Sequence, residues 1–207
     1  AEAGREIVCF SISAGMSTSG NVMRLAAEEL GASDRIKVID SANLSTGIGL
    51  LVIEAAIMAK NNRTASQIVS EIEKLKPNVR ASFVVDTLTY LYRGGRCNAV
   101  AAMAGGVLKL HPRIVVEDGA MNASKKYRGK IASVVMNYVK DMEKDLKKAR
   151  PERVFITHSG CEQETVEKVR AYLKELDIFD EILETRAGGV VSSHCGPGTL
   201  GVLYIAK

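Results

Sequence analysis

The stretch that decides the fold class is residues 7–20, which read IVCFSISAGMSTSG. Residues 7–13 form a short apolar run of the kind found in a buried strand, and residues 14–20 form a turn rich in glycine and serine. A helix is expected to follow and to end at Gly31. Its apolar residues at helical spacing are Val22, Leu25, Ala26 and Leu30. The turn is therefore predicted to lie between the end of a strand and the N-terminus of a helix, where anions bind.

The same alternation of strand and helix continues through the first half of the chain. Residues 36–40 are predicted to form a strand and residues 48–60 an apolar helix. Thr64 and Gln67 have the spacing of a capping box, which predicts the start of a helix that Pro77 ends. Residues 81–86 are predicted to be a third strand, so we expect three parallel strands covered by helices.

A short helix followed by paired glycines is expected at residues 87–96, with Arg93 and Arg96 on either side of the glycines. Arginine recognises carboxylate or phosphate through a bidentate, permanently charged contact. The alternative is that both arginines pair with surface carboxylates. Residues 98–109 are rich in alanine and are predicted to form a further helix.

The pattern changes after Pro112. Asp118-Gly119 between two β-like segments predicts a hairpin. Helix, strand, helix and strand are then expected at residues 130–149, 153–158, 162–176 and 181–186. The fold class is therefore predicted to be α/β, with two α/β domains. A first domain with a parallel sheet that is incomplete at its N-terminus is expected over residues 1–95, and a mixed-sheet domain with flanking helices over residues 96–207, with a ligand cleft between them.

Composition excludes several classes of protein. The 207 residues are 46% hydrophobic, which suffices for a sizeable core, and no apolar run approaches the roughly 18 residues of a membrane span. The four cysteines are far apart in the sequence and no leader opens the chain, so we expect no zinc site, no disulfide framework and a cytoplasmic location. The absence of Trp and the 5% aromatic content argue against nucleic acid as a partner.

Residues 192–201, SSHCGPGTLG, contain the strongest candidate site. His194 stands among serines, Thr199 and three glycines, so side-chain donors and backbone N–H groups could converge on one small anion. The glycines also spell the dinucleotide fingerprint G-x-G-x-x-G, but too few residues follow for the helix and acidic residue that this fingerprint needs. The alternative is a Gly-rich turn before a last strand.

Four motifs, in this order and spacing, resemble the DegV family, whose better understood members are fatty-acid-binding subunits of a bacterial fatty acid kinase. The motifs are the Ser-rich turn at residues 13–19, Asp40-Ser41 with Ser45, Gly47 and Gly49, Asp86-Thr87-Leu88 with Arg93-Gly94-Gly95-Arg96, and His194-x-Gly196-Pro197-Gly198-Thr199-Leu200-Gly201. Together they run through nearly the whole chain, which makes them far more specific than any one of them alone.

The resemblance implies two α/β domains with a long-chain fatty acid between them, its carboxylate held by Ser17 and His194. The protein would be a cytoplasmic carrier without chemistry, cofactor or metal of its own and without stable insertion in a membrane. It would present the carboxylate to a separate ATP-dependent fatty acid kinase subunit for acyl-phosphate formation. The candidate ligand-binding residues are Ser17, Thr18, Ser19, Arg96, His194, Gly196, Gly198 and Thr199.

The chain departs from the family pattern in two places. Family members usually carry Ser-Gly-Thr where this chain has Ser17-Thr18-Ser19, so the backbone of the turn lacks the freedom of glycine. The family also normally begins with a further β-α segment whose Thr-Ser-rich turn contacts the carboxylate. Either the 207 residues are a fragment or another chain supplies that segment.

Two other functions remain open at this point. A serine hydrolase would use Ser17 as nucleophile and His194 as base, with Asp40 or Asp86 orienting the histidine. Residues 15–19 fall one residue short of the G-x-S-x-G nucleophile elbow, because Ser19 occupies the place of the second glycine. An interaction module would use the cleft between the domains only structurally, and its serines would merely cap a helix.

Overall fold

The computed structural model describes residues 4–96 and 110–207. The chain forms two compact units, the first running to Val79 and including Asp118–Ala120, the second comprising Arg80–Glu117 and Met121–Lys207. The first contains a small parallel sheet and the second a six-stranded mixed sheet, each with helices, so the predicted α/β class is confirmed. The division into domains at residues 95 and 96 stays a prediction.

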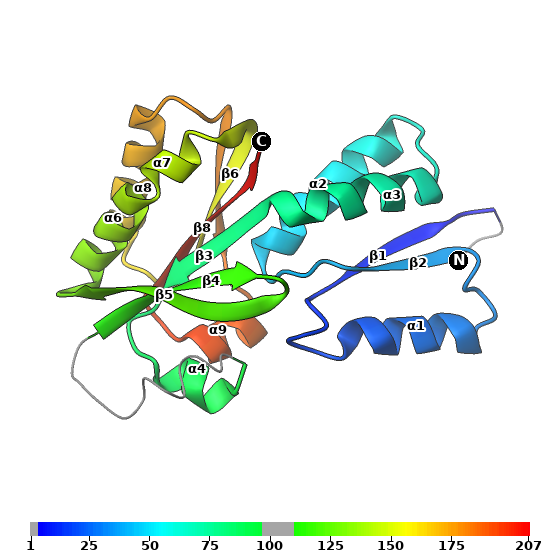
Figure 1. Cartoon of the computed structure of the whole chain (residues 1–207), viewed down its shortest axis with the longest axis horizontal. Helices are drawn as coiled ribbons and strands as arrows, with labels where there is room; N and C mark the ends of the chain where they lie inside the picture. Colours follow the sequence, from blue (N-terminus) through cyan, green and yellow to red (C-terminus); the bar gives the residue numbers. More distant parts are fainter. Residues whose placement is uncertain (1–3, 97–109) are drawn as a thin grey trace. The chain divides into compact units, whose positions relative to one another are not determined.

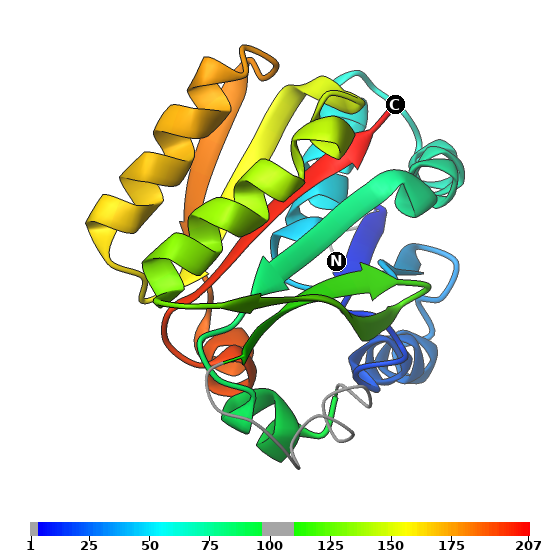
Figure 2. The same ribbon diagram turned by 60° about the vertical axis from the view of Figure 1, so that its left-hand side comes forward.

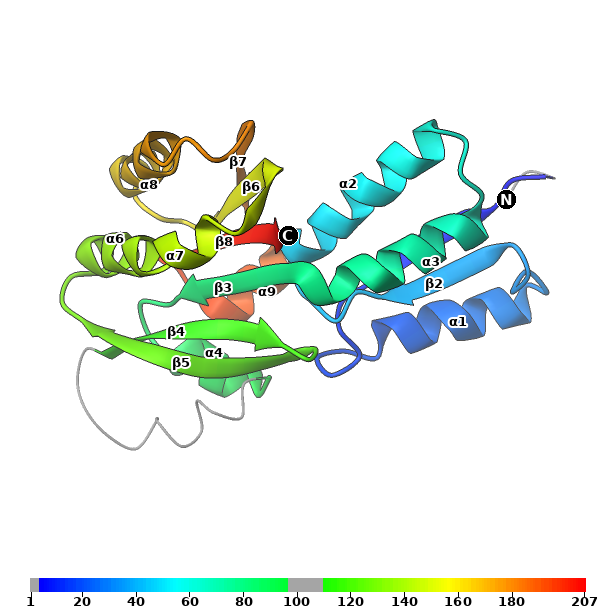
Figure 3. The same cartoon turned by 45° about the horizontal axis from the view of Figure 1, so that its top comes forward.

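The sheet of the first unit has two parallel strands. β1 (Ile7–Ser11) pairs with β2 (Ile36–Asp40) so that Ser11 lies opposite Asp40. Each strand leads into a helix, α1 (Ser19–Glu29) and α2 (Thr46–Lys60). α1 lies on one side of the sheet, and α2 lies with α3 (Ala65–Leu75) on the other (Figure 1), as Figure 3 also shows from a second direction.

Small residues bring α1 close to β1. The buried residues of α1 are Gly20 and Ala27, and a Cβ added at Gly20 would lie 2.6 Å from Ser11 Oγ. The apolar residues whose spacing predicts this helix are exposed instead, with exposed fractions of 75% for Leu30 and 60% for Val22. The periodicity therefore predicts the helix correctly. The contact of this helix with the sheet depends instead on its small residues.

α3 (Ala65–Leu75) begins with the predicted capping box. Thr64 Oγ1 accepts a hydrogen bond from the Gln67 N–H at 3.3 Å, and the Thr64 N–H donates to Gln67 Oε1 at 3.0 Å. The helix ends at Leu75 and is followed by a 3₁₀ turn (Lys76–Asn78) that contains Pro77. Both predicted ends of this helix are thus confirmed.

Thr64→Ala is expected to lower the free energy of unfolding by about 1 kcal/mol, because an N–H of the first turn loses its side-chain acceptor. Urea denaturation measures this loss. Ser70→Ala, an exposed serine of the same helix, is the matched control and should change stability little. Equal effects of the two substitutions would contradict a stabilising role for the cap.

The sheet of the second unit has the strand order β5-β4-β3-β8-β6-β7. β6 and β7 are parallel, whereas β3 and β4, and β6 and β8, are antiparallel. Figure 2 shows the helices α6 (Ile131–Asp141) and α8 (Gln163–Glu175) lying on one face of this sheet. The strands are β3 (Val79–Val84), β4 (Leu110–Glu117), β5 (Ala120–Arg128), β6 (Ala149–Ser159), β7 (Glu181–Arg186) and β8 (Thr199–Ala206).

The expectation that residues 81–86 form a third parallel strand of the first sheet is wrong. β3 belongs to the six-stranded sheet and pairs with β4 in antiparallel fashion, with Ala81 opposite Val116. An apolar run of this length fits the centre of either sheet equally well. The hairpin of β4 and β5 decides between the two sheets, because β4 pairs with β3 although it lies far along the chain.

That hairpin is itself confirmed. Asp118 and Gly119 have φ values of 49° and 74°, the left-handed backbone that a two-residue type I′ turn requires.

The other predicted elements of the second unit are largely confirmed. The helix expected over residues 130–149 is interrupted at Met142 and forms α6 (Ile131–Asp141) and the short α7 (Glu143–Leu146). α8 (Gln163–Glu175) and β7 lie where they were expected. The helix predicted at residues 98–109 lies outside the described residues. Two short helices, α4 (Thr89–Gly94) and α9 (Gly189–Cys195), pack against each other.

Candidate functional site

The Ser-rich turn places two hydroxyl groups at the N-terminus of α1. Ser17 Oγ and Ser19 Oγ are hydrogen-bonded at 2.7 Å, and the Ser19 N–H donates to Ser17 Oγ at 3.2 Å. Thr18 occupies the N-cap position, but its side chain makes no capping hydrogen bond, and the first turn carries no acidic residue. This end of the helix is therefore a positive, hydroxyl-rich surface of the kind that attracts an anion.

Buried polar contacts hold this turn in place. Ser13 Oγ donates to Gly119 O at 2.6 Å and accepts from the Gly15 N–H at 3.1 Å, while the Ser13 N–H donates to Asn43 O at 2.9 Å. Ser13 is almost fully buried. Gly119 and Asn43 thus hold in place the turn that carries Ser17.

The loop after β2 forms a second, strained support at the same end of the small sheet. Ala42 and Ser45 have φ values of 49° and 50°, a conformation that costs non-glycine residues energy and often marks a functional site. The Asp40 carboxylate accepts hydrogen bonds from the backbone N–H of Ala42 at 2.9 Å and of Ala14 at 3.3 Å. Asp40 therefore ties the loop after β2 to the turn after β1.

His194 lies on α9, a helix that the sequence analysis did not predict. The glycines of the motif follow the helix, beginning with Gly196. Ser192 Oγ donates to Ala187 O at 3.0 Å and Ser193 Oγ donates to Val190 O at 2.8 Å, so both hydroxyls bond to the backbone of their own segment. The expected convergence of these two serines on an anion is therefore not present.

The His194 imidazole is half-buried and packs on α4. A Cβ added at Gly94 would overlap the His194 ring, with Nδ1 as the nearest atom. Among the described residues, no hydrogen bond to the imidazole is found. The ring is thus held by packing and keeps its capacity to bond with a ligand.

The residues after His194 are tied to the strand β6 and to α9. The Gly198 N–H donates to Ser159 O at 2.9 Å, and the buried Thr199 Oγ1 donates to Cys195 O at 2.9 Å. The Gly196 N–H donates to Ser192 O at 2.8 Å. These groups anchor the segment behind His194, and their proposed contact with a ligand stays a prediction.

Arg96 is exposed and its guanidinium donates to Gly94 O at 2.8 Å. A cation at this place also compensates the negative end of α4. Arg96 is thereby held beside the same glycine on which the His194 ring packs.

Asp86 lies where β3 leads into α4, and His111 of β4 lies beside it. The Asp86 carboxylate, whose side chain is 49% exposed, is 3.7 Å from His111 Nδ1. His111 is buried, with Nδ1 at 3.1 Å from Val85 O and Nε2 at 3.0 Å from Gly129 O. Asp86 thus lies beside a histidine other than His194.

A second histidine cluster was missed at the sequence level. His158 Nε2 lies 3.3 Å from Glu184 Oε1, and His158 Nδ1 accepts a hydrogen bond from the Cys161 N–H at 3.3 Å. Glu184 also pairs with Arg170. Burial raises the pKa of the Cys161 thiol to about 12, with smaller contributions from Glu162 and Asp86. The thiol stays neutral at physiological pH and donates to Thr199 O at 3.3 Å. The position of His158 at the end of a predicted strand was the one signal available.

Within residues 4–96 and 110–207, no group of three or more His, Cys, Asp or Glu side chains could hold a metal ion. None of the helices in this described part is long and apolar enough to cross a membrane.

The fold and these groups define an α/β protein with polar junctions suited to hold a small anionic group: a hydroxyl-lined helix N-terminus in the first unit and an imidazole on a short helix in the second. The chain belongs to the DegV family, because a family model described as "Uncharacterised protein, DegV family" matches residues 1–207.

Known proteins agree with this assignment. A DegV domain-containing protein from Caldanaerobacter subterraneus subsp. tengcongensis is 32% identical over 183 residues, which are 87% of this chain and 64% of that protein. The chain therefore spans slightly less than two thirds of this relative.

Two solved structures of the family have the same fold. A structure described as fatty acid binding of a DegV family protein from Thermus thermophilus is 26% identical, with a TM-score of 0.88 over 100% of this chain and 72% of that one. DegV from Bacillus subtilis, described as a fatty acid binding protein, is 28% identical, with a TM-score of 0.77 over 97% of this chain and 71% of that one.

Proposed function

We propose that this protein binds a long-chain fatty acid and that Ser17 and His194 hold its carboxylate. The observation that carries the proposal is the likeness, over the whole chain, to the Thermus thermophilus structure described by its fatty acid binding. The geometry adds a reason. Ser17 stands at the positive N-terminus of α1, and His194 has no hydrogen-bonding partner among the described residues.

The energetics favour a long alkyl chain over a small carboxylic acid. Burying about 14 methylene groups at about 0.8 kcal/mol each contributes roughly 11 kcal/mol before the costs of association. A carboxylate that exchanges water for one hydroxyl and one imidazole contributes far less. The alkyl chain is thus proposed to supply most of the affinity, and the two polar groups to orient the carboxylate.

The finer function that we propose is that of a cytoplasmic carrier that presents the carboxylate to a separate ATP-dependent kinase, with Thr18, Ser19, Arg96, Gly196, Gly198 and Thr199 lining the head-group region. Three observations favour a carrier over a hydrolase. Ser17 Oγ is hydrogen-bonded to Ser19, the Asp40 carboxylate bonds backbone N–H groups, and Asp86 faces His111.

Mass spectrometry of an organic extract of the purified protein tests this function. A co-purified long-chain fatty acid in near-stoichiometric amount is the expected result. An empty extract, together with no uptake of added oleic acid by the purified chain, would overturn the proposal. Hydrolysis of simple esters that disappears in Ser17→Ala would instead establish the hydrolase.

A further inference from the structure

α4 and α9 contact each other through two rings that each pack on a glycine of the other segment. His194 of α9 packs on Gly94, the last residue of α4, where any Cβ would overlap the imidazole. Tyr90 of α4 packs on Gly196, the residue that follows α9, where a Cβ would overlap the phenol ring. We call these two contacts the ring–glycine contacts: His194 on Gly94, and Tyr90 on Gly196.

The first contact determines which ring nitrogen can reach a ligand. The three ring atoms nearest to the place of a Gly94 side chain are Nδ1, Cε1 and Cγ, in that order. The Nδ1 edge of the imidazole therefore faces α4, and Nε2 lies on the far side. Neutral imidazole can donate a hydrogen bond through either nitrogen. Because Nδ1 faces α4, Nε2 is the nitrogen that remains available to bind an anionic ligand.

The second contact fixes the end of α9. Gly196 has a φ value of 78°, which favours glycine, and a side chain there would be excluded by the Tyr90 ring as well. The helix thus ends against the same helix α4 on which its histidine packs. The two contacts are close together on both segments, since Tyr90 and Gly94 are four residues apart and His194 and Gly196 are two residues apart.

We propose that Gly94 and Tyr90 are positioning residues for His194: they hold the imidazole so that Nε2, and not Nδ1, binds the carboxylate of the ligand. This inference rests on the proposed function. It gives a reason for glycine at position 94, where neither the backbone conformation nor the helix requires that residue. Glycine is less favourable than alanine in a helix, and the close packing of the imidazole gives a reason for glycine at this position.

Gly94→Ala tests the inference, with Gly189→Ala in α9 as the matched control, since nothing lies within 4 Å of an added Cβ at Gly189. The readout is the ratio of the affinities for oleic acid and oleyl alcohol, which share one alkyl chain and differ in the head group. Gly94→Ala should lower this ratio by about ten-fold or more, because a misplaced imidazole loses a charge-assisted bond. Gly189→Ala should leave the ratio unchanged.

A double-mutant cycle separates positioning from a general loss of structure. In a His194→Ala background the added methyl group has no ring to displace, so Gly94→Ala should have no further effect on the ratio. Tyr90→Ala, which removes a ring and adds no atoms, should lower the ratio as Gly94→Ala does. An effect of Gly94→Ala that persists unchanged without the imidazole would overturn the inference.

NMR of the imidazole tests the positioning even if the ligand assignment fails. The chain has three histidines, so the spectrum of His194→Ala identifies the signals of His194. Gly94→Ala should shift these signals, whereas Gly189→Ala should not. Unshifted signals would overturn the inference for any ligand. Shifted signals, combined with equal affinity of the wild-type protein for acid and alcohol, would uphold the positioning and overturn only the proposed head-group site.

Discussion

His194→Ala is expected to weaken binding of oleic acid by roughly ten- to a hundred-fold, while binding of oleyl alcohol is retained. The imidazole is half-buried and has no hydrogen-bonding partner within residues 4–96 and 110–207, so its loss leaves no group of that part of the chain unpaired. A charge-assisted hydrogen bond to a carboxylate contributes about 1.5 to 3 kcal/mol, which corresponds to that loss of affinity. The alkyl chain keeps its larger apolar contribution.

Isothermal titration with the purified chain measures the two affinities, and Ser193→Ala is the matched control. Ser193 is exposed on the same helix, and its hydroxyl bonds to Val190 O. Acyl-phosphate formation with an ATP-dependent fatty acid kinase should fall further than binding in His194→Ala, because a carboxylate displaced by about 1 Å reacts poorly. Unchanged binding and turnover, or loss of the folded state, would show that the histidine is incidental or structural.

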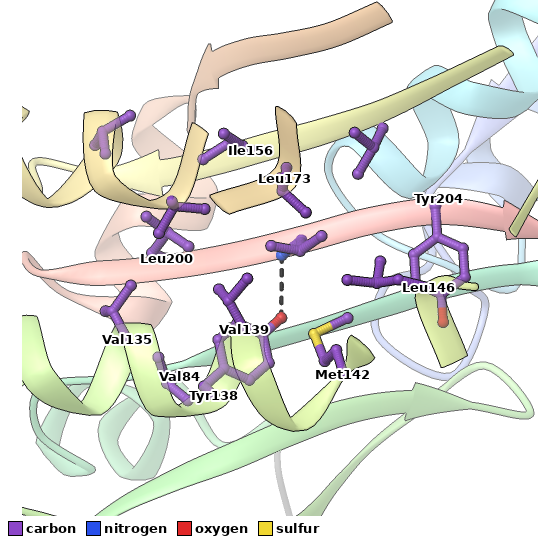
Figure 4. Packing of buried hydrophobic residues seen from close by; sticks show 14 of the residues in the cluster. Val84, Val135, Tyr138, Val139, Met142, Leu146, Ile156, Leu173, Leu200 and Tyr204 are labelled. Carbon is purple, nitrogen blue, oxygen red and sulfur yellow. Dashed lines mark hydrogen bonds between the residues drawn. The ribbon is translucent and has the colours of Figure 1, made fainter. Parts of the chain in front are cut away.

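Tyr138→Phe is expected to lower the free energy of unfolding by about 1 to 3 kcal/mol, although it removes a single oxygen atom. The Tyr138 hydroxyl donates to Ser82 O at 2.7 Å and accepts from the Val202 N–H at 3.0 Å, which joins α6 to the two central strands β3 and β8. Figure 4 shows the bond from Tyr138 to β8 among the buried side chains. Burial raises the pKa of this phenol, so it stays neutral and able to donate. Phenylalanine would leave a carbonyl and an N–H group buried without this partner.

Tyr172→Phe is the control, because the Tyr172 hydroxyl donates to Glu143 in a half-buried place near the surface. The free energy of unfolding of Tyr172→Phe should differ from that of the wild-type protein by no more than about 0.5 kcal/mol, since water can replace the phenol hydroxyl. Guanidinium denaturation at pH 7 compares the two variants. Equal stabilities would mean that the buried groups find other partners or water, and that the hydroxyl is dispensable for the core.

Local patterns of the sequence determined most of the helices and strands. The capping box at Thr64, the hairpin at Asp118-Gly119 and the strand at residues 181–186 were each predicted from a few adjacent residues. These features depend on the backbone preferences of near neighbours, so they are present in the sequence itself. The Ser-rich turn at the N-terminus of α1 was predicted for the same reason.

Only the tertiary structure decided which distant segments meet. The sequence could not place β3 in the six-stranded sheet, because an apolar strand satisfies either sheet until a partner is chosen. Nor could it show that Asp40 joins two loops or that Gly94 lies beneath the His194 ring. These contacts join residues as many as 100 positions apart, as Gly94 and His194 are. Their geometry depends on the packing of whole helices and strands, which no local pattern of residues encodes.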